Sequence, residues 1–211
     1  MLKFIIIPFL IHMTTFWSMS ALFYLLDRKY LDKNHVNWIN YGIAARNSFL
    51  NQLFVGLPTL YFTENYIIAA VNKSSYDSYI YILFKLFLIG TIANLLFYLS
   101  HRLLHTRFLF TTIHYIHHQF IEPVAVASLH AHPIEHLTAN TLAFFIPFFI
   151  IGLPYYMMLF MICIGTTMIV LSHVNYNIPF YGNEHKIHHI RFKYNFGIGM
   201  YLDKFFNTYT D

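Results

Sequence analysis

Long apolar runs with almost no charge dominate the pattern of this chain. They cover residues 2–26, 79–100 and 137–171. A helix that crosses a bilayer needs about 20 mainly apolar residues, and the first two runs have that length. The third run is too long for one helix. Because Pro147, Gly152 and Pro154 interrupt it near its middle, it predicts a hairpin of two half-to-full spans.

A weaker apolar run, 49–71, contains Pro58 and Glu64 and is either a further span or a segment in the membrane interface. A cleaved signal peptide is the alternative for the first run, but that run exceeds an h-region and no small-x-small site follows it. We therefore expect an all-α, polytopic membrane bundle of about four to five segments. Its N-terminal scaffold would cover 1–94, and a second, C-terminal region would cover 95–211 and include the hairpin at 137–172.

Composition and charge agree with a membrane protein. The chain is 57% hydrophobic and only 10% charged. The net charge is +4, but the basic residues do not form the stripe that is typical of a nucleic-acid-binding surface, so no nucleic-acid partner is expected. The basic residues instead gather beside the histidine-rich regions. The positive-inside rule then places those regions on the cytosolic face, provided that 49–71 spans the bilayer. In a eukaryotic cell the expected membrane is the endoplasmic reticulum.

Histidine is concentrated in the second half of the chain, where all but His12 and His35 of the 14 histidines lie. Those two have no histidine neighbour and are read as structural. The others include an H-x3-H pair and two H-x2-H-H clusters: His101 and His105; His114, His117 and His118; His185, His188 and His189. Residues three and four apart share a helix face, so each cluster can direct two imidazoles to one point. A polar cluster at the end of a membrane span is a functional-site signal.

Three such clusters point to metal, because imidazole suits zinc, copper, iron and nickel. Eight ligands exceed the four of a tetrahedral site and favour two ions. His173, at the end of the hairpin, is a ninth candidate. In the stretch EPVAVASLHAHPIEHL, His132 is either a ligand or a group that orients one, and His130 and His136 are weaker candidates. Glu135 could orient an imidazole, act as the catalytic carboxylate, or simply favour a helix N-terminus.

The boxes HRLLH, HYIHH and HKIHH, in this order, resemble those of the fatty acid hydroxylase superfamily. That superfamily includes sterol C4-methyl oxidases, sterol C5-desaturases and sphingolipid hydroxylases. The stretches EPVAVASLHAHPIEH, SHVNYNIPF and NFGIGMYLDKFFNT also resemble segments of sterol methyl oxidases. The likeness covers roughly 43–210. Three positions depart from the pattern: Asn175 replaces a glycine, Lys186 an aspartate, and Asn207 the glycine of a closing Gly-Thr.

The resemblance implies a non-haem oxygenase with two irons per chain, for which zinc could substitute. It would use O2 and electrons from cytochrome b5 or a reductase to hydroxylate or desaturate a bilayer lipid, and the motifs favour a sterol. The residues carry no haem-attachment motif, Rossmann fingerprint or nucleophile elbow. Two other classes stay open: a zinc-dependent membrane hydrolase with Glu135 or Glu184 as general base, and a metal transporter or bis-histidine haem protein.

Overall fold

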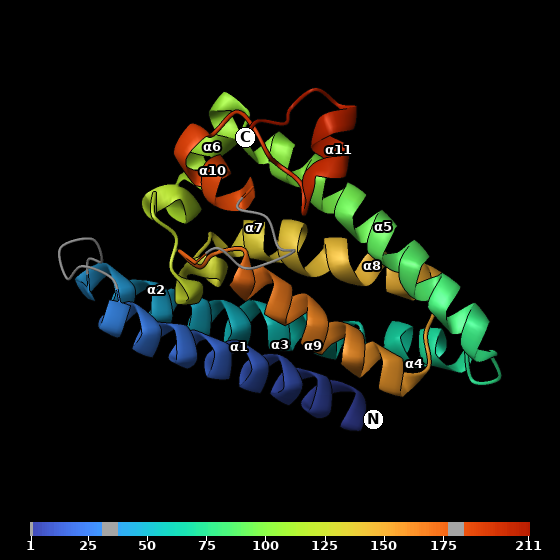
Figure 1. Ribbon diagram of the computed structural model, residues 1–211. Coiled ribbons are helices and arrows are strands. Elements are labelled where there is room, and N and C mark those ends of the chain that lie inside the picture. Colours follow the sequence, from blue (N-terminus) through green and yellow to red (C-terminus); the bar gives the residue numbers. More distant parts are fainter. Residues whose placement is uncertain (1, 31–37, 177–183) are drawn as a thin grey trace.

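The computed structural model describes residues 2–30, 38–176 and 184–211, and His35 lies outside them. The described residues form helices and contain no strand (Figure 1). In chain order the elements are α1 (Lys3–Tyr30), α2 (Trp38–Asn51), η1 (Gln52–Gly56), α3 (Leu57–Phe62), α4 (Glu64–Asn72), α5 (Tyr79–Leu104), α6 (Arg107–Thr112), η2 (His114–Gln119), η3 (Ala125–Leu129), α7 (Pro133–Glu135), η4 (His136–Leu142), α8 (Ala143–Ile151), α9 (Tyr155–Leu171), α10 (Glu184–Arg191) and α11 (Met200–Phe205).

Three helical stretches of the described chain are long and apolar enough to cross a membrane. They are Lys3–Arg28, Tyr79–Leu104 and Pro133–Ile151, and α9 is a shorter apolar helix. Their outer faces expose large apolar side chains, such as Leu25, Phe87 and Ile150, which are 65%, 72% and 68% exposed. Exposed apolar side chains on long apolar helices are typical of a surface that faces lipid. The predicted all-α membrane bundle is confirmed.

The hairpin forms from α7, η4 and α8 on one side and α9 on the other. Only the segment around Gly152 breaks it, because Pro147 stays inside α8. Gly152 has φ +79°, and a Cβ there would collide with the carbonyl oxygen of Ala70. Glycine is therefore required at this turn. The two arms face different neighbours: α9 packs against α1, and α8 against α5 (Figure 1).

The weaker apolar run folds as η1, α3 and α4, after α2, and is not among the stretches long and apolar enough to span. Its Leu60 and Ile67 join the core formed with Phe145 and Phe148 of α8. Its first element, η1, is a π-helical turn within an otherwise α-helical segment, and so is η4 of the hairpin. The run therefore supports the hairpin from one side.

Polar elements gather at the C-terminal end of α5. There α6, η2, α10 and α11 form a cap over one end of the bundle (Figure 1). The cap contains the three histidine clusters, which lie far apart in sequence.

Candidate metal centre

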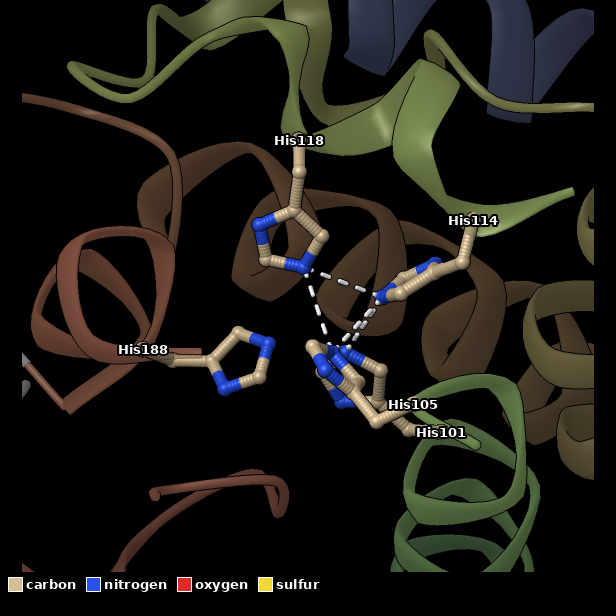
Figure 2. Close-up of side chains that lie close together, drawn as sticks. All are labelled: His101, His105, His114, His118 and His188. Carbon is tan, nitrogen blue, oxygen red and sulfur yellow. Dashed lines mark hydrogen bonds between the residues drawn. The ribbon is translucent and has the colours of Figure 1, made fainter. Parts of the chain in front are cut away.

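In the part of the chain that the structure describes, nine histidine side chains meet in the cap in two groups. In each group, one ligand atom from every residue lies within 4.8 Å of the others. The first histidine group, arranged around a common centre in Figure 2, is His101, His105, His114, His118 and His188. The second histidine group is His117, His173, His185 and His189.

Each H-x2-H-H cluster contributes histidines to both groups. The i,i+4 pair of one cluster belongs to the first group, and the i,i+4 pair of the other belongs to the second. In η2, His114 and His118 belong to the first group and the residue between them, His117, to the second. In α10, positions i and i+4 belong to the second group, and His188, at i+3, belongs to the first. The i,i+4 pair thus shares one point, as the spacing predicts, while the third imidazole reaches the neighbouring point. The remaining ligands come from the end of α5 and from His173, just after α9.

Facing nitrogens define the first group. The Nε2 atom of His114 lies 3.1 Å from that of His101, 3.0 Å from that of His105 and 3.1 Å from that of His118. The Nε2 atoms of His105 and His118 are 3.2 Å apart. His188 Nε2 is buried and has no hydrogen-bond partner. One nitrogen of a neutral ring cannot donate a single proton to three neighbours at once, so a hydrogen-bond network does not account for the convergence.

The second group shows the same convergence as a chain of contacts. His173 Nε2 lies 3.2 Å from both His117 Nε2 and His185 Nε2. His185 Nε2 and His189 Nε2 are also 3.2 Å apart. The groups adjoin, because the rings of His118 and His189 have centroids 4.6 Å apart.

Backbone carbonyls fix which ring nitrogen carries the proton. A carbonyl only accepts, so the Nδ1 atom beside it must donate, and Nε2 of the neutral ring keeps a lone pair. Five rings are held in this way: His101 by the Phe196 carbonyl at 2.7 Å, His188 by Tyr194 at 2.6 Å, His117 by His130 at 3.3 Å, His173 by Ile169 at 3.1 Å and His189 by Phe120 at 2.8 Å.

Burial keeps these rings neutral. It lowers the pKa of His173 to about 4 and, with the charge of neighbouring imidazoles, holds that of His117 well below its usual value. The facing Nε2 atoms of His117 and His173 therefore present two lone pairs to each other with no proton between them. Such a contact is repulsive unless a cation takes both lone pairs.

The spacing fits a metal ion. Two nitrogens bound at 2.0–2.1 Å and at a right angle lie about 3.0 Å apart. The Nε2–Nε2 contacts of both groups, from 3.0 to 3.2 Å, match this value. Nδ1–H donation to a carbonyl is the usual way in which a protein orients a histidine ligand. The nine residues therefore fit two adjacent metal ions.

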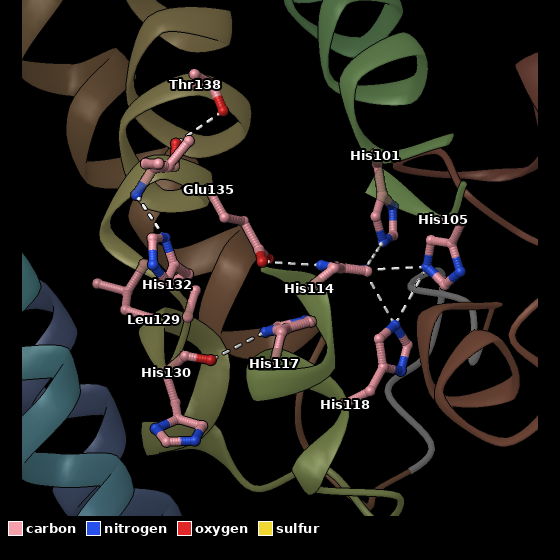
Figure 3. A network of polar contacts seen from close by, with 12 residues as sticks. His101, His105, His114, His117, His118, Leu129, His130, His132, Glu135 and Thr138 are labelled. Carbon is pink, nitrogen blue, oxygen red and sulfur yellow. Dashed lines mark hydrogen bonds and ion pairs between the residues drawn. The ribbon is translucent and has the colours of Figure 1, made fainter. Parts of the chain in front are cut away.

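Glu135 approaches the first group from behind a ligand. Its Oε2 atom lies 2.9 Å from His114 Nδ1, although the alignment falls outside hydrogen-bond geometry. Figure 3 shows Glu135 on the side of the His114 ring away from His101, His105 and His118. A buried carboxylate at Nδ1 supports the orienting role for Glu135.

The other histidines near Glu135 lie outside both groups. His132 caps α7, and its Nδ1 accepts from the Ile134 backbone N–H at 3.2 Å. The His130 ring contacts Gln119 and Asn47, and only its carbonyl meets the centre, through His117. The structure thus brings together nine of the ten histidines proposed from sequence and leaves His132 apart.

The sequence alone assigned no role to Asp203 of α11, whose carboxylate binds the backbone beside the histidine groups. Its carboxylate accepts from the backbone N–H groups of Phe196 and Gly197, each at 2.8 Å, and from the Thr208 hydroxyl at 2.8 Å. Asp203 is 1% exposed. Because the Phe196 carbonyl accepts from His101 Nδ1, Asp203 holds the acceptor that orients a candidate ligand. The only sequence signal was its place in the closing motif.

The departure at Asn207 has a structural reason. Asn207 has φ +56°, in the left-handed region that favours glycine. Asparagine tolerates this region better than most residues, so it can replace the glycine of the closing Gly-Thr.

Comparison with known proteins agrees with this arrangement. The sequence profile described as "Fatty acid hydroxylase" matches residues 86–208. The chain is 28% identical to fatty acid hydroxylase domain-containing protein 2 of Macaca fascicularis, over 92% of this chain and 63% of that protein. It is 29% identical to methylsterol monooxygenase 1 of Gallus gallus, over 80% of this chain and 59% of that protein.

A shorter match is 36% identical to fatty acid hydroxylase ahd1 of Mycosarcoma maydis, over 53% of this chain and 30% of that protein. No solved structure matches. The chain thus spans less than two thirds of the length of these relatives. The profile covers more than half of the chain, including all nine grouped histidines. The chain belongs to the fatty acid hydroxylase family.

Proposed function

We propose that this chain is the core of a membrane oxygenase that hydroxylates or desaturates a lipid, with two iron ions held by the two histidine groups. The observation that carries the proposal is the convergence of unprotonated Nε2 atoms at two adjacent points. Bound iron would supply the redox chemistry that activates O2 against an unreactive C–H bond.

The protein's own residues hold and orient that centre. The backbone carbonyls at Nδ1 fix each ring with Nε2 directed inward, and Asp203 holds one of those carbonyls in place. Glu135 faces Nδ1 of His114, on the side from which a carboxylate orients a histidine ligand. The apolar helices below the cap would present a bilayer lipid to the centre without its leaving the membrane.

Relatives named for fatty acids and relatives named for sterols both match, and we base the sterol proposal on the sequence motifs together with the methylsterol monooxygenases. The proteins named methylsterol monooxygenase from Danio rerio and Gallus gallus match over 81% and 80% of this chain, whereas fatty acid hydroxylase ahd1 matches over 53%. We propose that electrons come from cytochrome b5 or a reductase docked on the cap. In a eukaryotic cell the membrane would be the endoplasmic reticulum.

The position of Glu135 speaks against this residue as the general base of a zinc hydrolase. A general base must reach the water bound to the metal, on the Nε2 side of the ligands. Glu135 instead meets the Nδ1 side of His114. A transporter is also disfavoured, because the candidate ligands lie at the ends of helices and not at mid-membrane depth.

The test is complementation. The chain, and a His117→Ala variant as the inactive control, are expressed in cells that lack sterol C4-methyl oxidation and in cells that lack sphingolipid 2-hydroxylation. We expect restored sterol products with the wild type and none with the variant. Restored 2-hydroxy sphingolipids with unchanged sterols would overturn the sterol assignment alone. Absence of either product from inserted, metal-loaded protein would contradict the oxygenase.

A further inference from the structure

A chain of polar side chains crosses the interior of the bundle, apart from the two histidine groups. The Trp17 indole donates to Gln52 Oε1 at 2.9 Å, and Gln52 Nε2 lies 3.2 Å from His12 Nε2. His12 Nδ1 lies 2.9 Å from the Thr166 hydroxyl. These residues come from α1, η1 and α9. Polar groups within apolar spans are costly and usually functional, so we expect this hydrogen-bonded row of side chains to have a function.

The donor-to-acceptor direction of these hydrogen bonds follows from the first donor, the Trp17 indole. An indole N–H can only donate, which fixes the oxygen of Gln52 and leaves its amide nitrogen to donate to His12 Nε2. Neutral His12 then carries its proton on Nδ1 and donates to Thr166. The Thr166 hydroxyl already accepts, so it has its own proton to offer.

Thr166 and His12 line a cavity of about 80 Å³ between α1, α9 and η4. From η4, His136 and Asn140 also line it. His136 is 3% exposed, and its buried Nδ1 has no hydrogen-bond partner. The rest of the lining is mainly apolar: Phe9, Leu60, Phe144, Phe145, Ile162 and Ile169. The cavity therefore combines a free hydroxyl proton, an unpaired imidazole nitrogen and hydrocarbon walls.

Two further features indicate a binding site. Both π-helical turns border the cavity, through Gly56 of η1 and through η4, and π-helical turns often occur at functional sites. The cavity also adjoins the residues behind the metal centre. Leu129 lines it and precedes His130, whose carbonyl holds His117, while His136 follows Glu135.

We propose that this cavity binds the hydroxyl group of an uncharged membrane lipid, a sterol or a long-chain alcohol. A hydroxyl can accept from Thr166 and donate to a neutral imidazole such as that of His136. Among the residues that the structure describes, no lysine or arginine lines the cavity, so a carboxylate or phosphate would be bound without a counter-charge. At this volume the cavity holds the hydroxyl and its nearest carbons, and the rest of the lipid lies outside. That this lipid is the substrate rests on the proposed function, but its binding does not.

The test measures binding without turnover. The metal-loaded full chain is placed in lipid nanodiscs without reductant, and the binding of tritiated cholesterol and tritiated octadecanol is compared with that of their methyl ethers and of stearate. Thr166→Val removes the hydroxyl and keeps the shape. Thr167→Val is the matched control, because that neighbouring threonine bonds the Cys163 carbonyl and does not line the cavity. His136→Phe replaces the second polar group by an apolar ring, should the first variant fail to fold.

We expect the wild type and Thr167→Val to bind at least one alcohol about tenfold more tightly than its methyl ether, the worth of one ordinary hydrogen bond. His136→Phe should lose that preference, because the ether keeps its acceptor oxygen and lacks only the proton donated to His136. Thr166→Val should bind both the alcohol and its ether about tenfold less tightly than the wild type does. The alcohol that shows the preference, cholesterol or octadecanol, identifies the lipid class. Equal binding of alcohols and ethers, equal loss in Thr166→Val and Thr167→Val, or tighter binding of stearate would overturn the site. Product formation, measured separately, tests the oxygenase independently.

Discussion

Replacing Asp203 with asparagine should weaken metal binding without changing a ligand. Asparagine can accept from the Phe196 or the Gly197 N–H but turns its own NH2 toward the other. Of the two bonds from backbone N–H groups, one charge-assisted bond is lost and the other becomes neutral. Since a hydrogen bond to a charged group contributes about 1.5–3 kcal/mol and a neutral one about 1 kcal/mol, the loop should lose about 3 kcal/mol. His101 then loses a fixed acceptor, and metal affinity should fall about 10- to 100-fold.

The assay is metal retention during dialysis against chelators of graded strength, followed by metal analysis. Asp77→Asn is the matched control, because that carboxylate pairs with buried Lys85 at 2.7 Å at the start of α5. It should lower thermal stability and leave metal affinity unchanged. If Asp203→Asn retains its metal as well as Asp77→Asn does, the reasoning that the closing motif positions a ligand is refuted.

Other substitutions test separate parts of the account. Glu135→Gln should reduce metal affinity about tenfold in the same dialysis assay, because it removes the carboxylate behind a ligand; unchanged affinity with lost turnover would show that Glu135 acts on the substrate. His188→Ala should lower the metal content of the purified protein whereas His132→Ala should not, and equal loss would contradict the assignment of His132 outside both groups. Gly152→Ala should lower the free energy of unfolding in detergent by at least about 2 kcal/mol, because of the positive φ and the blocked Cβ position. Gly90→Ala, in open space on α5, should not lower it. Similar thermal unfolding midpoints for the two variants would contradict the requirement for glycine at the turn.

Much of the architecture could be predicted because membrane spans and helix faces are local properties. The length of an apolar run predicts a span, and Gly152 and Pro154 predict the hairpin turn. The spacing of His114, His117 and His118 predicts that two rings share a point. Periodicity does not say which neighbouring element supplies the partners, so the opposite assignment of the η2 and α10 clusters could not be predicted.

Contacts between distant elements were also beyond the sequence. His12 stands alone in its span, and its partners Gln52 and Thr166 become visible only when α1 lies between η1 and α9. Asp203 is one of few acidic residues after residue 100, but its role depends on a fold that brings the Phe196 N–H to its carboxylate. Such roles arise from tertiary structure, which no short motif encodes.

The most direct test of the central claim is the number of metal ions per chain. Protein purified from iron-replete cells is analysed for total metal, with zinc counted as a possible substitute for iron. Two complete histidine groups predict close to two ions per chain. A single tightly bound ion in fully active protein would contradict the account.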